Sequence, residues 1–507
     1  MHHTYVNPLC LLDMPVLKCK SHQKGQENQG DPFALGKMIC EQLPATHERF
    51  KPVFRGMLPY LSENDTRATA DPAGFYYNNE WYIYSSNGAL WHSEDFENWD
   101  FTDVGYVYEY APGITVARNA DGEERFYLAG NSTHLFVADN PKGPFKDIGE
   151  FTWQGKAIEP QNNDVALFTD DDGQMYLYWG MGPGIYGAKL CLDKPNELAS
   201  APVEIIRFNP ENTYERMGQH NQNWENGFPE GAWMLKYKGV YYLIWATAGT
   251  QYDTYCMGAY KSLEGPLSGF EIQKRPAALN EGGRLLRGAG HGSIVEGPDE
   301  TLWCFYTVNI GLENDMERRI ACEPVAVDEN GDIYVPSFCD EPQYVPGYKA
   351  HPEKDNRTGE VTLTARQVHI ATSHVNGYPP IYALDENMMT CWQPAKEDKQ
   401  PSLVVSLQGN YYVSASRVMF KEIGLDIESG SNKSTFKYKI EVMDSADEQW
   451  KILVDRTKNE ADFIMDYQRA DAPIRGQFVR LTLTGWNENV RPGVVEFSCF
   501  GKSCQQQ

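Results

Sequence analysis

Three acidic residues occupy equivalent places, each just ahead of a short aromatic segment. Asp71 lies in "RATADPAGFYYNNEWYIY", Asp164 in "NDVALFTDDDGQMYLYW" and Glu230 in "FPEGAWMLKYKGVYYLIW". Paired carboxyl groups can hydrolyse a glycosidic bond, because one protonates the departing oxygen while the other activates water or attacks the sugar. A single acid of this kind can equally cap a strand or pair with arginine, but three in register favour a shared site.

Asp164 is closely followed by a second run of aspartates, "DDDG" at 170–173. Asp and Gly are residues that tight turns select, and "YNNE" at 77–80 and "YKGV" at 237–240 stand at the same position in two other segments. The run also lacks the spaced ligands and the terminal Glu of a calcium loop. We therefore expect Asp164 to face the site and "DDDG" to close a hairpin.

The aromatic segments belong to a repeat. Helical periodicity is nearly absent, and short apolar runs bounded by Gly, Pro, Asn and Asp are typical of strands and turns. Five copies have equivalent aromatic anchors at Tyr82, Tyr127, Tyr176, Tyr242 and Trp303. Their spacings of 45, 49, 66 and 61 residues fit four-stranded propeller blades. Because the innermost strands of a propeller surround its axis, acids at equivalent strand starts should converge at one mouth.

The predicted fold class is all-β, with a five-bladed β-propeller over residues 51–341. Residues 1–50 are expected to form an extension that packs on the propeller, and the early "NPL" is a candidate for pairing into a blade. A linker over 342–366 leads to alternating strands such as "SLVVSL" and "FVRLTLTGW". These strands predict a β-sandwich over 367–507.

Charge and composition limit the partners. The net charge of −25 opposes binding to nucleic acid or to anionic membranes, and no run approaches the roughly 20 apolar residues of a membrane helix. Eleven cysteines without a CxxC pair, and no signal-peptide pattern, predict a cytoplasmic protein. The many aromatic residues fit sugar stacking as well as a β-rich core. We therefore expect a neutral partner, an oligosaccharide or polysaccharide.

On these motifs the propeller segment resembles glycoside hydrolase family 43, the five-bladed enzymes of hemicellulose and arabinan breakdown. "TADP" is similar to the motif that carries the family's general base, "NDVALFTDDDG" to its "DPALFxDDDG", and "EGAWMLKYKGVYYL" to its "EGP/A" strand. The resemblance implies that Asp71 is the general base, Asp164 the pKa modulator and Glu230 the general acid. It also implies inversion, which requires roughly 6.5–9.5 Å between base and acid to admit water.

The resemblance extends to the fifth blade. "GAGHGSIVEGPDETLW" resembles the "GHGS" motif, which implies that His291 lies on the propeller axis and helps bind substrate, a calcium ion or water. No cofactor is needed for the reaction, and a structural calcium ion on the axis remains open. "ERRIACEPV" resembles the segment whose arginine reaches the substrate, and on a strand one of Arg318 and Arg319 faces in and the other out. Trp224 and Tyr252 lie in predicted loops and are candidate sugar platforms.

Two departures from the family pattern stand out. Val165 replaces the usual proline after the second aspartate, a change that should preserve the carboxylate, and a long N-terminal stretch precedes the first motif.

The C-terminal segment resembles the coagulation factor 5/8 type C, or discoidin-like, domain through "ALDENMMTCW", "FVRLTLTGW" and "VVEFSCFG". Such a domain can bind carbohydrate or only pack beside the catalytic domain, and both roles stay open.

These resemblances imply an inverting exo-acting glycosidase that removes a terminal furanose or pentose from plant-type oligosaccharides. α-L-Arabinofuranose is the first expectation, and β-D-galactofuranose and β-D-xylose are the alternatives. A hypothesis from another class is a sugar-binding propeller without catalysis, against which the presence of all three acids argues. A retaining fructosidase is a further rival, but the chain has no "WMNDPNG"-like opening.

Overall fold

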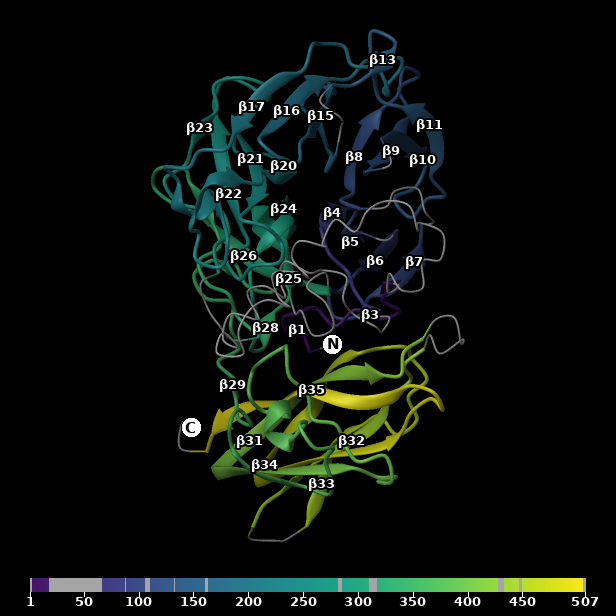
Figure 1. Ribbon diagram of the computed structural model, residues 1–507, viewed down its shortest axis with the longest axis vertical. Helices are drawn as coiled ribbons and strands as arrows, with labels where there is room; N and C mark the ends of the chain where they lie inside the picture. The colour runs from purple at the N-terminus through teal and green to yellow at the C-terminus, as the bar shows by residue number, and fades with distance from the viewer. Residues whose placement is uncertain are drawn as a thin grey trace, which may run out of the picture.

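The structure is a computed structural model that describes residues 2–17, 66–86, 88–104, 110–131, 133–159, 163–280, 285–309, 317–426, 433–445 and 449–504. These residues form two β domains stacked along the long axis of the molecule (Figure 1). Over the described ranges, no helix has the length and apolar character to cross a membrane. Of the extension predicted over 1–50, only residues 2–17 fall within the described chain.

The first domain consists of five four-stranded antiparallel sheets, each built from strands consecutive in the chain. They are β4 (Ala73–Tyr77), β5 (Glu80–Ser85), β6 (Ala89–Ser93) and β7 (Asp100–Asp103); β8 (Gly113–Arg118), β9 (Glu124–Ala129), β10 (His134–Ala138) and β11 (Lys146–Glu150); β14 (Ala166–Thr169), β15 (Met175–Trp179), β16 (Gly184–Lys189) and β17 (Val203–Arg207); β20 (Glu230–Tyr237), β21 (Val240–Thr247), β22 (Cys256–Ser262) and β23 (Glu271–Ile272); and β24 (Gly290–Glu296), β25 (Leu302–Asn309), β26 (Arg318–Val327) and β27 (Ile333–Tyr334). The first strands of the sheets contact one another in a closed ring, β4, β8, β14, β20, β24 and back to β4. The predicted five-bladed propeller is confirmed.

The repeat seen in the sequence corresponds to the second strand of every blade. The five aromatic anchors lie on β5, β9, β15, β21 and β25, and all are buried. Each pairs with a residue of the innermost strand, as Tyr82 does with Phe75 and Trp303 with Val295. The aromatic side chains therefore fill the space between neighbouring blades, where a single four-stranded sheet could not bury them.

Short elements complete the propeller. They are β12 (Thr152–Trp153) paired with β13 (Lys156–Ala157), β18 (Arg216–Met217) paired with β19 (Asn223–Gly227), and the 3-10 turns η3 (Thr213–Glu215) and η4 (Pro298–Glu300). Near the N-terminus, β1 (Thr4–Tyr5) pairs with β28 (Gln343–Tyr344), and β2 (Val16–Leu17) with β3 (Thr66–Arg67).

The "NPL" segment lies along the fifth blade without being one of its strands. Asn7 Nδ2 donates to the carbonyl of Cys322 (2.8 Å), and the Cys322 amide donates to Asn7 Oδ1 (2.9 Å). The amide of Leu9 donates to the carbonyl of Ile320 (2.9 Å). The Tyr5 hydroxyl also donates to the Cys322 carbonyl (3.0 Å), so two side chains and a backbone bond attach the N-terminal segment to β26.

The second domain is a β-sandwich. Its sheet order is β29 (Val361–Thr362), β35 (Arg491–Ser503), β31 (Ser402–Ile423), β34 (Met465–Gly485), β32 (Lys437–Met443) and β33 (Trp450–Asp455), while β30 (Val368–Ala371) pairs with β31; η5 is Pro380–Ala383. Register shifts along β31 between Ser406 and Tyr411 and between Val413 and Ala415 interrupt its pairing, and such irregularities bend long strands. Trp392 is fully buried and donates its indole N–H to the carbonyl of Ser373 (2.9 Å). This burial and this contact give Trp392 a structural role.

Candidate active site

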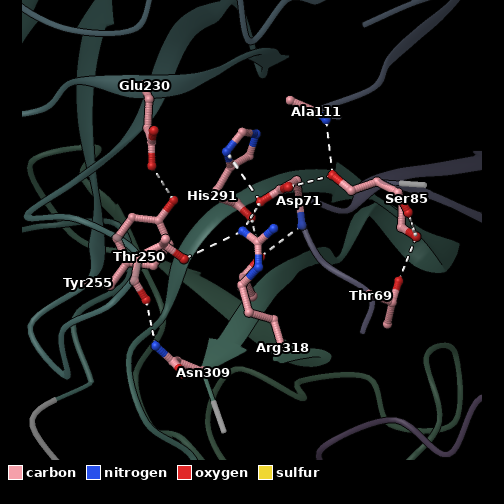
Figure 2. Close-up of polar contacts among 12 residues, drawn as sticks. Thr69, Asp71, Ser85, Ala111, Glu230, Thr250, Tyr255, His291, Asn309 and Arg318 are labelled. Atoms are coloured by element: carbon pink, nitrogen blue, oxygen red, sulfur yellow. Dashed lines mark hydrogen bonds and ion pairs between the residues drawn. The ribbon is translucent and has the colours of Figure 1, made fainter. Parts of the chain in front are cut away.

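Asp71 lies at the mouth of the propeller, two residues before the innermost strand of the first blade. Its backbone has a positive φ of 55° and its side chain is buried. The amide donates to Thr307 Oγ1 (2.9 Å) and the carboxylate Oδ1 accepts from Arg318 Nη1 (3.0 Å), while Oδ2 accepts from the Ser86 hydroxyl. Figure 2 shows Asp71 directed at the Arg318 guanidinium and the His291 ring.

These contacts keep Asp71 ionised. Burial by itself would raise the pKa of its carboxyl group, but the charges of Arg318 and His291 and the hydrogen bond from Ser86 outweigh burial. The net effect is a pKa below the ordinary value of an aspartate. Opposite charges and hydrogen-bond donors both favour the carboxylate form.

Glu230 is the first residue of β20 and has the opposite surroundings. Its Oε1 accepts a hydrogen bond from the Tyr255 hydroxyl (2.6 Å), as Figure 2 shows. Burial, with the negative charge of Asp164 as the next cause, raises the pKa of Glu230 to about 8, although the Tyr255 bond opposes the rise. At neutral pH this carboxyl group therefore keeps its proton.

Asp164 lies two residues before β14, in the third blade, with a φ of 46°. Its amide donates to Asn131 Oδ1 (2.6 Å), and its Oδ2 is 3.8 Å from His291 Nδ1. Burial raises the pKa of Asp164, with the charge of His291 lowering it and that of Asp71 raising it. The three acids thus start the innermost strands of blades one, three and four and converge at one mouth, as the repeat predicts.

His291 lies between Asp71 and Asp164. It is the second residue of β24, and its Nδ1 is 3.5 Å from Asp71 Oδ1 on one side and close to Asp164 on the other. The ring packs on Gly231, where an added Cβ would lie 2.7 Å from the His291 ring. Gly231 also has a φ of 58°, so glycine is required there for two reasons.

The glycines beside His291 have comparable roles. An added Cβ on Gly290 would lie 2.2 Å from the ring of Tyr255, the residue that bonds Glu230. An added Cβ on Gly292 would lie 1.9 Å from the carbonyl oxygen of Phe305. The "EG" and "GHGS" motifs therefore let the His291 ring pack on Gly231, next to Glu230, and let Tyr255 pack on Gly290, next to His291 in the chain.

The adjacent arginines point in different directions. Arg318 Nη1 contacts Asp71 and lies 3.5 Å from Thr250 Oγ1. Arg319 Nη1 instead donates to the carbonyls of Arg67 (2.6 Å) and Arg318 (2.8 Å), and its Nη2 pairs with Glu317 (3.2 Å). Arg318 thus faces the acids, whereas Arg319 joins neighbouring backbone segments.

The family model of glycosyl hydrolases family 43 matches residues 64–333, which is 270 of the 507 residues. The chain belongs to this family. It is therefore a glycoside hydrolase, and family 43 enzymes invert configuration. The model of the F5/8 type C domain matches residues 369–497, within the β-sandwich.

Individual relatives are distant. A beta-D-galactofuranosidase of Aspergillus niger is 22% identical over 365 residues, covering 66% of this chain and 95% of its own. A xylosidase/arabinosidase of Humicola insolens is 27% identical over 252 residues, covering 36% and 74%. A solved family 43 arabinoxylan arabinofuranohydrolase of Bacillus subtilis, in complex with cellotetraose, is 18% identical, covers 86% of this chain and 96% of its own, and gives a TM-score of 0.43.

Among the described contacts of Asp71, Asp164 and Glu230, none is made by the two predicted sugar platforms, Trp224 and Tyr252. Trp224, on β19, is 53% exposed, and the Arg216 guanidinium lies 3.3 Å from its ring centroid. Tyr252 is buried in the loop after β21 that also carries Thr250 and Tyr255, and its amide donates to the carbonyl of Gly249 (3.1 Å). Substrate contact by Trp224, Tyr252 and Arg319 stays a prediction.

The aspartate run after Asp164 is a turn, as predicted. The Gly173 amide donates to the Asp170 carbonyl (2.9 Å), between β14 and β15. Asp170 also has a second role, because its Oδ1 contacts Lys236 Nζ (2.6 Å) and its Oδ2 accepts from the Tyr241 hydroxyl (2.7 Å). Those partners lie on β20 and β21, so Asp170 joins the third blade to the fourth.

Calcium binding on the axis stays a prediction as well. Within the part of the chain that the structure describes, no three or more His, Cys, Asp and Glu side chains gather as a metal-binding group. The Nδ1 of His291 faces Asp71 and Asp164. Any calcium ion there would depend on water for most of its ligands, so no step of the reaction is assigned to it.

Several site residues escaped the sequence analysis. They are Ser86, Asn131, Thr250, Tyr255 and Thr307, which bond the three acids, Arg318 or the backbone beside them. A signal was present for three of them, because "YSSN", "AGNS" and "TAGT" each lie at the end of the aromatic second strand of a blade. The ends of those strands lie at the same mouth as the starts of the innermost strands. Tyr255 gave no such signal, since its position depends on its packing against Gly290.

Proposed function

We propose that this family 43 member is an exo-acting enzyme that removes a terminal α-L-arabinofuranose from an oligosaccharide with inversion. The observation that carries the proposal is the contrast between Asp71, whose pKa is lowered, and Glu230, whose pKa is raised to about 8. Both groups have the ionisation that an inverting base and acid require near neutral pH.

In the proposed reaction Asp71 removes a proton from water as the water attacks the anomeric carbon. Glu230 gives its proton to the departing glycosidic oxygen, and the bond from that oxygen to the anomeric carbon breaks. Burial and Asp164 keep Glu230 protonated, and the Tyr255 hydroxyl holds its carboxyl group in one orientation. Arg318 keeps Asp71 charged, and its guanidinium is the candidate donor to a sugar hydroxyl.

β-D-Galactofuranose is the second candidate sugar. The galactofuranosidase relative aligns over 95% of its own length, and arabinofuranose and galactofuranose rings present much the same hydroxyl pattern. β-D-Xylose is a third candidate, since the relatives also include a xylosidase/arabinosidase. Among sugar platforms, Trp224 is the stronger candidate, because its ring is exposed and sugars stack on exposed aromatic faces.

The experiment compares wild type, Glu230→Ala and Asp71→Asn on α-L-arabinofuranosides, β-D-galactofuranosides and β-D-xylosides. Each sugar carries either a poor alkyl leaving group or a 2,4-dinitrophenyl group. Loss of the acid should lower kcat about 10²- to 10⁴-fold on the alkyl glycoside and far less on the dinitrophenyl one, which leaves without protonation. Loss of the base should lower kcat on both.

Asp170→Asn is the matched control, because it removes a carboxylate that contacts Lys236 and Tyr241 between blades. It should keep the kcat of wild type. Formation of the product with retained configuration, shown by NMR, would contradict the assignment of base and acid. Failure of wild type to cleave any of the glycosides would favour a sugar-binding propeller.

A further inference from the structure

Arg67 is a buried cation on β3, four residues before Asp71. Its Nη2 contacts both carboxylate oxygens of Asp462 (2.9 Å each), and its Nε donates to Glu422 Oε1 (3.1 Å). Both acids belong to the C-terminal domain, and the three side chains are less than 10% exposed. Because a buried charge is costly without partners, the two carboxylates compensate Arg67 across the domain interface.

The strand of Arg67 is also bonded to the arginine of the active site. Arg319 donates to the Arg67 carbonyl, and the amide of Thr69 donates to the Arg318 carbonyl (3.1 Å). Arg318 in turn contacts Asp71 (3.0 Å). Contiguous hydrogen bonds and ion pairs therefore connect two carboxylates of the C-terminal domain with the proposed base.

We propose that Asp462 and Glu422 are positioning residues for Asp71, so that the C-terminal domain is part of the catalytic unit. This inference rests on the proposed role of Asp71 as the base. Asp71 has a φ of 55°, a conformation that costs free energy in a non-glycine residue and that surrounding contacts stabilise. Arg67, fixed by the two acids, holds the segment that leads to Asp71.

The other charged groups that face Asp71 are His291, Asp164, Glu230 and Arg318, all on the propeller. Asp462 Oδ1 also accepts from the amide of Ser434 (2.8 Å), and its carbonyl accepts from the amide of Asp13 (3.0 Å). The carboxyl groups of Asp13 and Glu422 are the charged neighbours of the same sign. Removal of the charge at Asp462 is therefore expected to change the position of Asp71, because Arg67 and its strand would move.

The test uses Asp462→Asn in the full chain. Loss of the charge should let the Arg67 strand shift, and because small misplacements of catalytic groups cost rate, kcat should fall about 10- to 100-fold with KM nearly unchanged. Weaker contact with Arg318 should raise the pKa of Asp71. The acidic limb of the pH–rate profile should then move to higher pH, and a crystal structure of the variant should show a longer distance between Arg318 and Asp71.

Glu441→Gln is the matched control, because it removes a comparably buried carboxylate, whose partner Arg480 (2.7 Å) is more exposed, inside the C-terminal domain. It should lower the melting temperature but leave kcat and the acidic limb unchanged. If Asp462→Asn does not fold, Glu422→Gln, which weakens a single contact to Arg67, replaces it. The inference is overturned if the folded variant keeps the kcat and acidic limb of wild type while Asp71→Asn is inactive. Full activity of Asp71→Asn would instead refute the proposed function.

Discussion

At the scale of single residues, the site assigns opposite ionisation states to carboxyl groups that lie close together. Asp71 faces Arg318 and His291, whereas Glu230 faces the Tyr255 hydroxyl and the charge of Asp164. Both acids are in buried surroundings, so burial alone does not distinguish them. The two pKa values differ because Asp71 has positively charged neighbours and Glu230 has a negatively charged one. Each neighbour can be changed separately by mutation.

Asp164→Asn should move the basic limb of kcat/KM to lower pH. The negative charge of Asp164 raises the pKa of Glu230, so its removal lowers that pKa, and the acid loses its proton at a lower pH. Burial, the larger cause, remains, so the limb should stay above the ordinary glutamate value of 4.5. A pH–rate profile on one aryl glycoside measures the shift.

Tyr255→Phe should move the same limb in the opposite direction. The Tyr255 hydroxyl stabilises the carboxylate of Glu230, so losing it raises the pKa above about 8 and extends activity to higher pH. The two variants control for each other, because both remove one polar neighbour of Glu230. If the basic limb moved in the same direction in both variants, the assignment of Glu230 as the acid would be contradicted.

The acids themselves could be predicted from the sequence, but their neighbours could not. Asp71, Asp164 and Glu230 precede equivalent strands of a repeat, and the symmetry of a propeller brings such positions together. Tyr255 stands in a loop whose course is set by packing against Gly290. No pattern in the sequence specifies that contact.

At the scale of elements, the β20–β21 hairpin shows how a strand start is shaped for the site. Gly231 and Gly239 lie on this hairpin, and both have positive φ, 58° and 82°. The room for a side chain differs at the two positions. An added Cβ at Gly231 would meet the His291 ring, whereas one at Gly239 would meet nothing within 4 Å. The pair therefore separates backbone strain from displacement of the histidine.

Gly239→Ala should cost about 1–2 kcal/mol of stability through backbone strain and leave kcat unchanged. Gly231→Ala should cost more and also lower kcat by about tenfold or more, because it pushes His291 out of its place between the acids. Thermal unfolding and kcat on one substrate measure both effects. Equal kcat for the two variants would show that the position of His291 does not matter for the reaction.

The turn after Asp164 and the orientation of the two arginines could be predicted only in part. The Asp170 turn follows from its Asp-Gly composition, but its bonds to Lys236 and Tyr241 join residues more than 60 positions apart in the chain. Strand alternation predicts that one of two adjacent arginines faces inward. The contact with Asp71 (3.0 Å) shows that it is Arg318.

At the scale of the whole molecule, the two domains share buried contacts that neither sequence pattern revealed. Arg417 of the sandwich is fully buried, and its Nη1 donates to the carbonyls of Asn7 and Asp340 (2.7 Å each). The predicted linker contributes one strand, β28, that pairs with the N-terminal β1, and another, β29, that pairs with β35. Contacts between residues hundreds of positions apart carry no local signal, so separate domains could be predicted but not their interlocking.

Glu323 lies where the N-terminal segment, the fifth blade and the segment leading to the sandwich meet. Its Oε1 accepts from Asn7 Nδ2 (2.9 Å) and from the amide of Cys339 (2.7 Å). Burial raises the pKa of Glu323 to about 8, and that of Glu496 in the sandwich likewise to about 8. Both groups are therefore protonated in the folded protein at neutral pH and ionised in the unfolded chain.

A raised carboxyl pKa makes the folded state hold more protons than the unfolded state between the ordinary value of 4.5 and about 8. The free energy of unfolding should therefore fall as pH rises through this window. Glu323→Gln keeps the acceptor oxygen without the ionisation, so it should raise stability at pH 8 by at least about 1 kcal/mol relative to wild type, with a smaller gain at pH 5. Glu329→Gln, on the exposed turn after β26, is the control, because it removes a carboxylate at the surface. Denaturant unfolding at both pH values measures the difference, and an equal gain at pH 5 and pH 8 would mean that Glu323 does not carry its proton into the folded state.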